Sequence, residues 1–564
     1  MFCTVFRLNI HKFTQIKIKT MHNIQNIKKL LFVVLLLFFQ ATSYAQNYQF
    51  IKDRCFGTPG GDLKCRIGKL NNNLFIAGIT GFVGTNEDKW DSSCNSTDIW
   101  YLLVDTALNI INSQAIGGQG VEDYPTFVID SVKNRIVISA RSNSDSSCDK
   151  SSNCRGYNDY WVVFLDSNLN KTQDYTFGSP QVEGGCISVL LSDGNLGVIG
   201  TSRSIIGGDK TAQGFGMDDY WVVKMDSMGH KVWDYAYGGS MEELSNFANL
   251  FHYDAVSTTG DSILIVGNTK SPASGTISVP VLGSTDYWAA MIDSSGTQVW
   301  DKRFGGNFHD YMSKILPEDD GYILVGSTLS DVGGTVGHPS LGSYDVWILK
   351  IDKAGNKLWD GRYGSVDGEQ GFDIQPAPDG GYWILGSTTS LLPSGDVSEP
   401  SYGQVDYWMI KVDSVGNLLW EKRFGGPFTD IPSSFVIMPN GSIYICGQSS
   451  GGTSAVKTDS GKGNVDYWIV HFNYYNNSTG IENDNFLPTL HAWPNPFHDD
   501  ISIDGIPSGQ HLATLFSTEG RQLWESNING GRRVTLNLPS LPNGLYFLQV
   551  QGKTGRRTIK ICKE

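Results

Sequence analysis

Long apolar runs, helical periodicity and an excess of positive charge are missing from most of this 564-residue chain. Beyond residue 45 no segment is apolar over the about 20 residues that a transmembrane helix needs, so we expect no membrane span there. The net charge of −14 argues against nucleic acid and anionic membranes as partners, because phosphate surfaces attract Lys and Arg. No window places apolar residues at helical spacing, which argues against a helical fold.

Catalytic signatures are also missing. The chain has no Gly-x-Ser-x-Gly elbow, no His-Glu-x-x-His and no Walker loop. His252, His309, His338 and His471 are scattered among different segments, and the carboxylates are too numerous to single out a glycosidase pair. The sequence therefore predicts no catalytic residue and no cofactor.

Cysteine is scarce, with nine residues in all. No Cys-x-x-Cys pair occurs, which argues against zinc-thiolate sites. In an exported protein the cysteines can form disulfides. Cys148 and Cys154 share one loop and are the predicted pair, and Cys55 with Cys65 is a weaker choice. Calcium remains a possible ligand, because the acidic stretches 88–98 and 145–159 supply oxygen ligands. These stretches lack the spacing of an EF-hand.

The first 45 residues have the pattern of a secretory signal. Lys28 and Lys29 precede an apolar run from Leu30 to Phe39, and small residues lead to Ala45. We expect cleavage after Ala45, with either Met1 or Met21 as the start.

One phrase, Asp-x-Trp, recurs seven times at steps of 59 to 67 residues. A fixed period of this length is typical of an array of one supersecondary unit. The copies are Asp98–Trp100, Asp159–Trp161, Asp219–Trp221, Asp286–Trp288, Asp345–Trp347, Asp406–Trp408 and Asp466–Trp468.

Each repeat contains four short apolar runs separated by turn residues. Around Asp406 the runs are 406–413, 418–424, 435–438 and 442–446, bounded by Gly, Asn and Pro. Four strands per repeat predict an all-β fold, a seven-bladed β-propeller over residues 46–473. The chain enters with a fourth-strand pattern at 48–57 and its last copy lacks a fourth strand, so we expect the N-terminal strand to close the ring.

The third and fourth runs resemble the tryptophan-docking motif of pyrroloquinoline-quinone dehydrogenases, as in Ile351-Asp352-Lys353-Ala354-Gly355-Asn356-Lys357-Leu358-Trp359. The resemblance implies a structural wedge between blades. It assigns that role to Trp233, Trp300, Trp359 and Trp420. The first two copies depart from the motif, with Asn112 and Gln173 near the tryptophan position. The family's adjacent-cysteine pair is absent, so no quinone is implied.

The chain ends in a different pattern. Residues 474–488 are polar and turn-rich, as in a linker, and residues 489–564 alternate short strands that predict a small β-sandwich. This stretch resembles the type A C-terminal sorting domain of type IX secretion in Bacteroidetes, and the repeats resemble large secreted proteins of that phylum. The matching residues are Pro494, Asn495, Pro496, Gly520, Gly544, Leu545, Tyr546, Lys560 and Lys563. The resemblance implies Sec export, the type IX machinery as partner, and a secreted or surface location.

Two functional hypotheses follow. The long loops of every repeat gather on one face and are rich in Gly, Ser and Asp, which favours a non-catalytic binding or adhesion scaffold for a glycan or protein. The alternative is a carbohydrate-active enzyme, a glycan hydrolase or lyase built on a propeller. The seven Asp residues of Asp-x-Trp are either a ring of carboxylates at a channel mouth or structural groups that hold their own loops, and we favour the second.

Overall fold

The computed structural model describes residues 48–95, 97–203, 206–244, 246–247, 250–251, 253–474, 491–493, 497–498, 500–517, 521–552 and 555–563. It divides into two compact units, the first formed by residues 50–474 and the second containing the described residues from 491 onward. The predicted signal peptide, and the predicted linker apart from Tyr474, lie outside the described residues. No helix among the described residues is long and apolar enough to cross a membrane.

The first unit is built from antiparallel four-stranded sheets, as the repeat predicts. Within the described residues of this unit six sheets have four strands and one has five, which together equal the number of Asp-x-Trp copies. The first three are β2 (Asp62–Leu70), β3 (Asn73–Thr80), β4 (Asp98–Val104), β5 (Ile110–Ile116); β6 (Glu122–Asp130), β7 (Arg135–Ser142), β8 (Asp159–Leu165), β9 (Lys171–Phe177); and β10 (Glu183–Leu190), β11 (Leu196–Ser202), β12 (Asp219–Met225), β13 (Lys231–Tyr237).

The fourth sheet has a divided inner strand. It comprises β14 (Glu243–Leu244), β17 (Asp254–Ser257), β18 (Ile263–Thr269), β19 (Asp286–Ile292) and β20 (Gln298–Phe304); the hairpin β15 (Asn246–Phe247) and β16 (Leu250–Phe251) and the short 3₁₀ turn η1 (Thr259–Asp261) belong to the same stretch. The last three are β21 (Asp310–Glu318), β22 (Gly321–Thr328), β23 (Asp345–Asp352), β24 (Lys357–Tyr363); β25 (Glu369–Pro376), β26 (Tyr382–Thr388), β27 (Asp406–Val412), β28 (Leu418–Phe424); and β29 (Asp430–Ile437), β30 (Ser442–Ser449), β31 (Asp466–Tyr474), β1 (Tyr48–Phe56).

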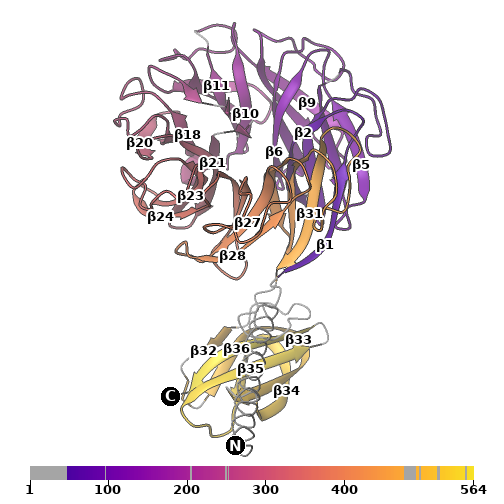
Figure 1. Cartoon of the computed structure of the whole chain (residues 1–564), viewed down its shortest axis with the longest axis vertical. Coiled ribbons are helices and arrows are strands. Elements are labelled where there is room, and N and C mark those ends of the chain that lie inside the picture. Colours follow the sequence, from indigo (N-terminus) through magenta and orange to yellow (C-terminus); the bar gives the residue numbers. More distant parts are fainter. Residues whose placement is uncertain are drawn as a thin grey trace, which may run out of the picture. The chain divides into compact units, whose positions relative to one another are not determined.

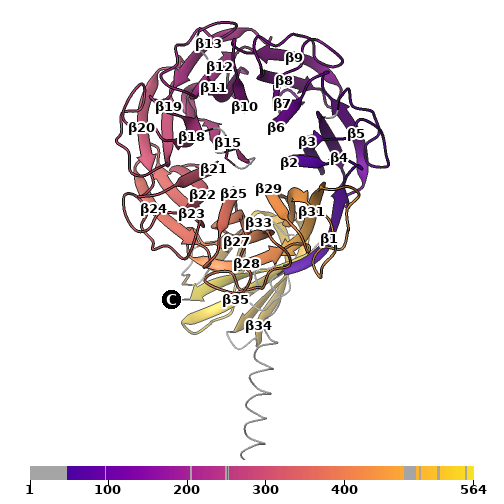
Figure 2. The same cartoon turned by 45° about the horizontal axis from the view of Figure 1, so that its top comes forward.

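The sheets stand around a common axis as the blades of a propeller (Figures 1 and 2). Figure 2 shows β2, β6, β10, β21, β25 and β29 nearest the axis and β5, β9, β13, β20, β24 and β28 at the rim. The predicted all-β propeller class is confirmed. Third strands such as β8 and β12 are buried along their whole length, because each sheet packs against a neighbour on both faces.

The innermost strands share a β-bulge near their beginning. In β2 the register shifts between Leu63 and Arg66. A shift near the start of the strand also occurs in β6, β10, β21, β25 and β29. A bulge turns a backbone group away from its own sheet. Beyond it, Ile67 N–H donates to Ser434 Oγ at 2.9 Å and Phe435 N–H donates to Asp373 Oδ2 at 3.1 Å, so neighbouring blades are hydrogen-bonded near the axis.

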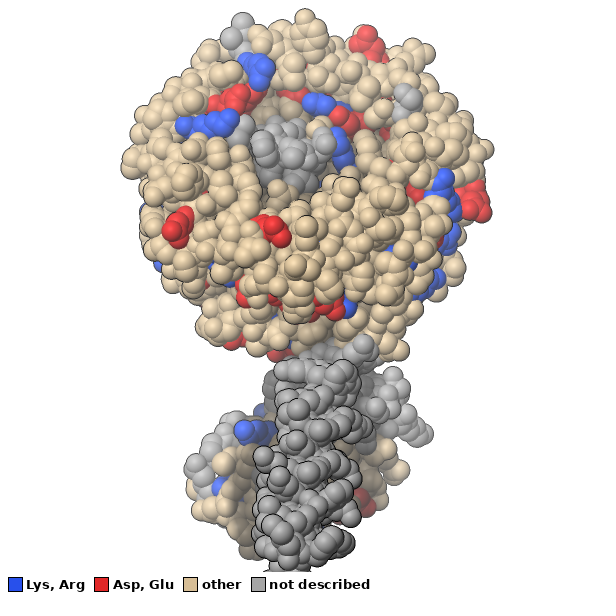
Figure 3. All heavy atoms as spheres, viewed as in Figure 1, with Lys and Arg blue, Asp and Glu red and all other residues tan. Residues whose placement is uncertain are grey.

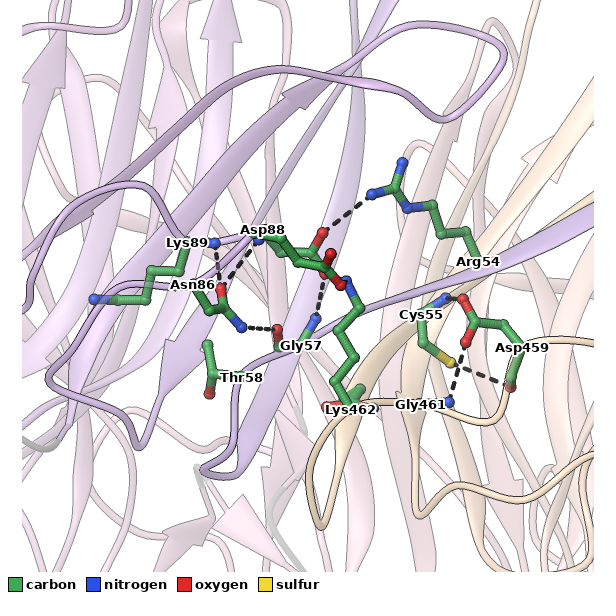
Figure 4. Close-up of polar contacts among 12 residues, drawn as sticks. Arg54, Cys55, Gly57, Thr58, Asn86, Asp88, Lys89, Asp459, Gly461 and Lys462 are labelled. Carbon is green, nitrogen blue, oxygen red and sulfur yellow. Dashed lines mark hydrogen bonds and ion pairs between the residues drawn. The ribbon is translucent and has the colours of Figure 1, made fainter.

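The ring closes where β1 completes the last blade beside β31. Figure 4 shows the polar contacts at this junction. The fully buried Asp88 of the first blade accepts from the Arg54 guanidinium at 3.0 Å and from Lys462 Nζ at 2.6 Å, and Cys55 N–H donates to Asp459 Oδ2 at 2.9 Å. Side chains from the N-terminal strand, the first blade and the last blade therefore meet in one network.

The C-terminal unit is also all-β. Its described strands are β32 (His491–Trp493), β33 (Asp500–Ser517), β34 (Gln522–Asn537), β35 (Gly544–Gly552) and β36 (Gly555–Lys563), joined into one antiparallel sheet. β33 and β34 are long, and the register between them shifts from Ile506 to Gly509. Its core includes Phe497, Leu515 and Leu548, all buried.

Asp53→Ala tests ring closure. Asp53 accepts from the Trp468 indole at 2.9 Å and from Thr458 N–H at 2.9 Å. Loss of the carboxylate leaves these buried donors unpaired, so the free energy of unfolding should fall by about 3 kcal/mol, measured by chemical denaturation.

Asp301→Ala is the matched control, because Asp301 makes the same two contacts, to Trp288 and Ser278, in a blade that the N-terminal strand does not complete. Both variants should lose similar stability, but only Asp53→Ala should expose residues 48–57 to protease. Equal protease resistance in the two variants would contradict the closing role of β1.

Candidate functional site

Each Asp-x-Trp tryptophan is fully buried and hydrogen-bonded within its blade. The indole N–H donates to a side chain of the outermost strand, which in six blades lies 13 residues later. The acceptors are Ser113, Asp174, Asp234, Asp301, Asp360, Glu421 and, in the last blade, Asp53, at 2.7 to 3.1 Å. The tryptophan therefore holds the third strand to the fourth.

The aspartate of each triplet holds its own long loop. Asp159 Oδ2 accepts from Arg155 N–H at 2.6 Å, and Asp286 Oδ2 accepts from Leu282 N–H at 3.1 Å. The same bond, to the backbone four residues earlier, occurs in the other five copies. These aspartates are at most 1% exposed. The geometry supports the structural reading of the seven carboxylates.

A second buried acid accompanies each of these aspartates. It begins the innermost strand of the next blade, 24 residues later, and in the last case lies on β2 of the first blade. The seven partners are Glu122, Glu183, Glu243, Asp310, Glu369, Asp430 and Asp62, none more than 1% exposed. Sequence reasoning missed this set, although the constant spacing of 24 residues is visible in the chain.

The two acids of a pair face each other across a glycine. A side chain at Gly117 would collide with both Asp98 Oδ1 and Glu122 Oε2. Glu122 accepts from Gly118 N–H at 2.9 Å and from Ser142 Oγ at 2.7 Å, whereas Oδ1 of Asp98 has no donor. The corresponding Oδ1 lacks a donor in Asp159, Asp219, Asp286, Asp345 and Asp406 as well. A proton shared between the two carboxyl groups would satisfy this oxygen.

The pKa values of these acids move accordingly. Burial, reinforced by repulsion from Glu122, raises the pKa of Asp98 to about 7. Burial, reinforced by Asp219, raises the pKa of Glu243 to about 8. Burial is also the main cause that raises the pKa of Glu183 to about 7 and that of Asp62 to about 6. Several blade junctions therefore hold a carboxyl that is protonated near neutral pH.

Charged side chains near the axis break the sevenfold pattern. Lys314 Nζ of β21 lies 3.0 Å from Asp254 Oδ2 of β17. Burial raises the pKa of Asp373 to about 6, although Lys314 and Arg66 oppose the shift. Figure 3 shows several Lys, Arg, Asp and Glu side chains near the middle of one face of the ring. Asp373 is 4% exposed and accepts backbone N–H groups from Ile374 and Phe435, so its carboxyl is already engaged.

A second blade-specific group lies at the first junction. Lys64 Nζ is 3.3 Å from the centre of the Tyr124 ring, and the Arg141 guanidinium is 5.0 Å from the same ring. Arg141 also forms an ion pair with Asp123 at 2.6 Å. Burial lowers the pKa of Lys64 to about 8. Cation–π contacts of this kind satisfy the lysine within the protein.

The long-loop face carries the exposed loop aromatics of the described residues. Parallel bridges, such as Asn158 with Val182 and Thr285 with His309, join long loops to blade-to-blade loops, which places both kinds of loop on one face. Exposed aromatic side chains from five places around that face are Trp90, Tyr157, Phe215, Phe308 and Phe428. The opposite turns expose aliphatic residues instead, including Met228 and Val415.

The four wedge tryptophans each approach the next blade. Trp233 Nε1 donates to Ser294 O at 3.2 Å, in the turn between β19 and β20. Trp300 and Trp359 lie against Gly355 and Gly416 in the equivalent turns. Trp420 has no such turn to meet and stacks on Phe472, with ring centres 6.2 Å apart. All four are half-buried.

The predicted Cys148–Cys154 disulfide is wrong. Cys148 is bonded to Cys94, with the two Cα atoms 6.4 Å apart. The bond joins the long loops of two neighbouring blades, a contact that proximity in the sequence does not reveal. Cys154 Sγ instead lies 3.2 Å from Ser142 O and from Ser144 O. The weaker alternative is also wrong, since Cys55 and Cys65 are not bonded to each other and Cys55 Sγ lies near Asp459 O.

Two of the candidate histidines make contacts within the protein. His338 Nε2 lies 2.9 Å from Asp360 O, and His471 stacks on Tyr444 with ring centres 4.1 Å apart. Burial lowers the pKa of His471 to about 4. His252 lies outside the described residues. Within the described ranges no cluster of three or more His, Cys, Asp or Glu is arranged to hold a metal ion, and calcium binding stays a prediction.

The described residues of the predicted sorting motif lie together. Gly544, Leu545 and Tyr546 of β35 pair with Lys563, Cys562 and Ile561 of β36. Tyr546 is buried and its hydroxyl donates to Pro542 O at 2.7 Å, while Lys563 Nζ lies 5.5 Å from the Phe497 ring centre. Lys560 is exposed. Pro494, Asn495, Pro496 and Gly520 lie outside the described residues.

Comparison with protein families matches residues 491–564 to the secretion system C-terminal sorting domain. The chain therefore carries a sorting domain of type IX secretion, the system of Bacteroidetes, and is directed to the cell surface or the extracellular space. The predicted location is confirmed.

The remaining likenesses are weak. The regulatory protein FlaEY of Caulobacter vibrioides is 26% identical over 203 residues, which is 35% of this chain and 20% of the relative. The chain thus matches about a fifth of that protein's length. The Pan2 WD40 domain of Neurospora crassa has a TM-score of 0.40 at 8% identity, covering 75% of this chain and 95% of the domain. The endosialidase of phage phi92 has a TM-score of 0.37 at 10% identity, covering 85% of this chain and 74% of the enzyme.

The paired acids predict an unusual pH dependence of stability. Free Asp and Glu lose their protons near pH 4, whereas the native acids named above keep theirs up to about pH 6 to 8. Between these limits the native state binds more protons, so the free energy of unfolding should fall as the pH rises from about 5 to about 8. Denaturant titration followed by tryptophan fluorescence measures this slope.

Glu243→Gln provides the control. The amide can donate to Asp219 Oδ1 without a shared proton, so the variant should show a shallower pH dependence than the wild type. A wild-type stability that is flat or rising between pH 5 and 8 would contradict proton sharing.

Proposed function

We propose that this chain is exported by Sec and the type IX machinery and acts outside the cell as a non-catalytic binding or adhesion scaffold. In this proposal the signal peptide, residues 1–45, directs export across the inner membrane. The sorting domain supports the export step. The binding role rests on the exposed aromatics of the long-loop face, because exposed aromatic side chains on a rigid scaffold favour a macromolecular partner.

The proposed ligand is a protein surface. The long-loop aromatics come from several blades, so they suit a broad, shallow contact better than a deep pocket for a small molecule. The acids that recur in every blade are buried and hydrogen-bonded within the protein, so a ligand cannot reach them. A glycan is the other ligand class that stacks on exposed aromatic rings.

The alternative, a carbohydrate-active enzyme, requires two free carboxyl groups beside a substrate. The buried acid pairs at the blade junctions are enclosed, and Asp373 near the axis holds backbone N–H groups. These observations favour the scaffold over the enzyme.

The binding face is tested with Phe308→Asp and Phe428→Asp in the full-length exported protein. Each variant places a charge in the proposed apolar contact, so binding to an array of extracellular proteins should fall at least about tenfold, equivalent to about 1.4 kcal/mol. Met228→Asp and Val415→Asp, on the opposite turns, are the matched controls and should bind normally.

The outcomes separate the ligand classes. Binding confined to a glycan array would replace the protein ligand with a carbohydrate. Glycan cleavage would favour the enzyme, and equal loss in the control variants would refute the assigned face.

The sorting step is tested by fusing residues 480–564 to a periplasmic reporter in a host with type IX secretion. The reporter should reach the cell surface. Gly544 has a φ of 153°, which side chains rarely adopt, so Gly544→Val should reduce display. Tyr546→Phe keeps the buried ring and loses one hydrogen bond, and should retain display. A wild-type fusion that stays in the periplasm would refute the role of this domain.

A further inference from the structure

Two cysteines meet where the first and last blades join. Cys65 lies on β2, beside its bulge, and Cys446 lies on β30 of the closing blade. Their sulfur atoms are 3.1 Å apart, although 381 residues separate them in the chain. Cys65 is 1% exposed and Cys446 is 0% exposed.

The surrounding backbone holds the two sulfurs together. Ser433 Oγ lies within hydrogen-bond reach of both Cys65 O and Cys446 O and shares its one proton between them, so one side chain bridges the two cysteines. Ile67 N–H donates to Ser434 Oγ at 2.9 Å, which fixes β2 against β29. Cys65 Sγ also lies 2.9 Å from Gly447 O. The contact therefore belongs to a hydrogen-bonded junction and not to a loop.

We propose that Cys65 and Cys446 form a disulfide that locks the propeller ring after export. A disulfide bond is about 2.05 Å long, so the sulfurs need to approach by only about 1 Å. The sorting domain sends the chain through oxidising compartments, where disulfides form and persist. The structure already holds one disulfide, between Cys94 and Cys148.

The oxidant is a protein or small-molecule disulfide of the export compartment. One cysteine thiolate attacks that disulfide and forms a mixed disulfide, releasing one thiol. The second cysteine then attacks the mixed disulfide, which gives the Cys65–Cys446 bond and releases a second thiol. The two cysteines lose two electrons and two protons, and the oxidant gains them as two thiols. Since both sulfurs are buried in the closed ring, the mixed disulfide forms before closure is complete.

Two other buried thiols have different neighbours. Cys186 is buried and its thiol points to Ala140 O at 3.3 Å. Cys55 lies near Lys457 Nζ and Asp459 O. Cys186 therefore serves as an internal reference, because it is as buried as Cys65 and its thiol lies against a backbone carbonyl.

Mass spectrometry of the full-length protein, collected after export, tests the proposal. The protein is denatured without reductant, alkylated with N-ethylmaleimide and digested. We expect a linked peptide pair that contains Cys65 and Cys446, while Cys186 carries the label. Labelled Cys65 and Cys446, or a link from either one to another cysteine, would overturn the proposal.

A gel measurement gives a second test. A crosslink that spans 381 residues compacts the denatured chain, so Cys94→Ser/Cys148→Ser protein should migrate faster without reductant than with it. Adding Cys446→Ser should abolish this shift, and adding Cys186→Ser should leave it unchanged. Equal migration of the Cys94→Ser/Cys148→Ser protein in both conditions would refute the bond. Because the chains are denatured on the gel, a modest loss of native stability does not change the migration that is measured.

Discussion

The buried bond from each Asp-x-Trp indole to the outermost strand is the contact on which the propeller depends. It joins the third strand to the fourth, while the aspartate of the same triplet ties the long loop to the strand that follows it. Both groups are buried, and a buried donor or acceptor without a partner is costly. The triplet thus satisfies the polar groups of a blade while its indole fills the space between sheets. In the last blade the acceptor is Asp53, so the contact that builds every blade also closes the ring.

The repeat period and turn residues predict much of the fold, because strand alternation and turn chemistry are local properties. The sequence predicts the strands, the completing N-terminal strand and the loop-holding role of the aspartates. It does not predict pairs that form across blades. Cys148 bonds to Cys94 of the neighbouring blade, and Cys65 meets Cys446 across the whole chain. Sequence proximity favoured Cys154, but ring geometry decides which loops touch.

The candidate site was predicted less completely for a related reason. The long loops could be placed on one face from antiparallel connectivity, but exposure of Tyr157 or Phe308 depends on how those loops fold over one another. The inner-strand acids are a different case. Their constant distance from the triplet aspartates is readable in the sequence, yet its meaning appears only when neighbouring blades place Glu243 against Asp219. A carboxyl pair is a property of the junction and not of either repeat.

Repetition separates the structural residues of this protein from those that can give it specificity. A group that recurs in every blade, such as the triplet aspartate or its acidic partner, makes the same hydrogen bonds within the protein each time. These contacts leave it enclosed. Recognition requires residues that differ between blades. Two sets meet that requirement: the charged groups near the axis, including Lys314 and Asp254, and the aromatics of the long loops. The first set is largely paired within the protein, whereas the second is open to solvent. The long-loop aromatics are therefore the blade-specific set that remains exposed.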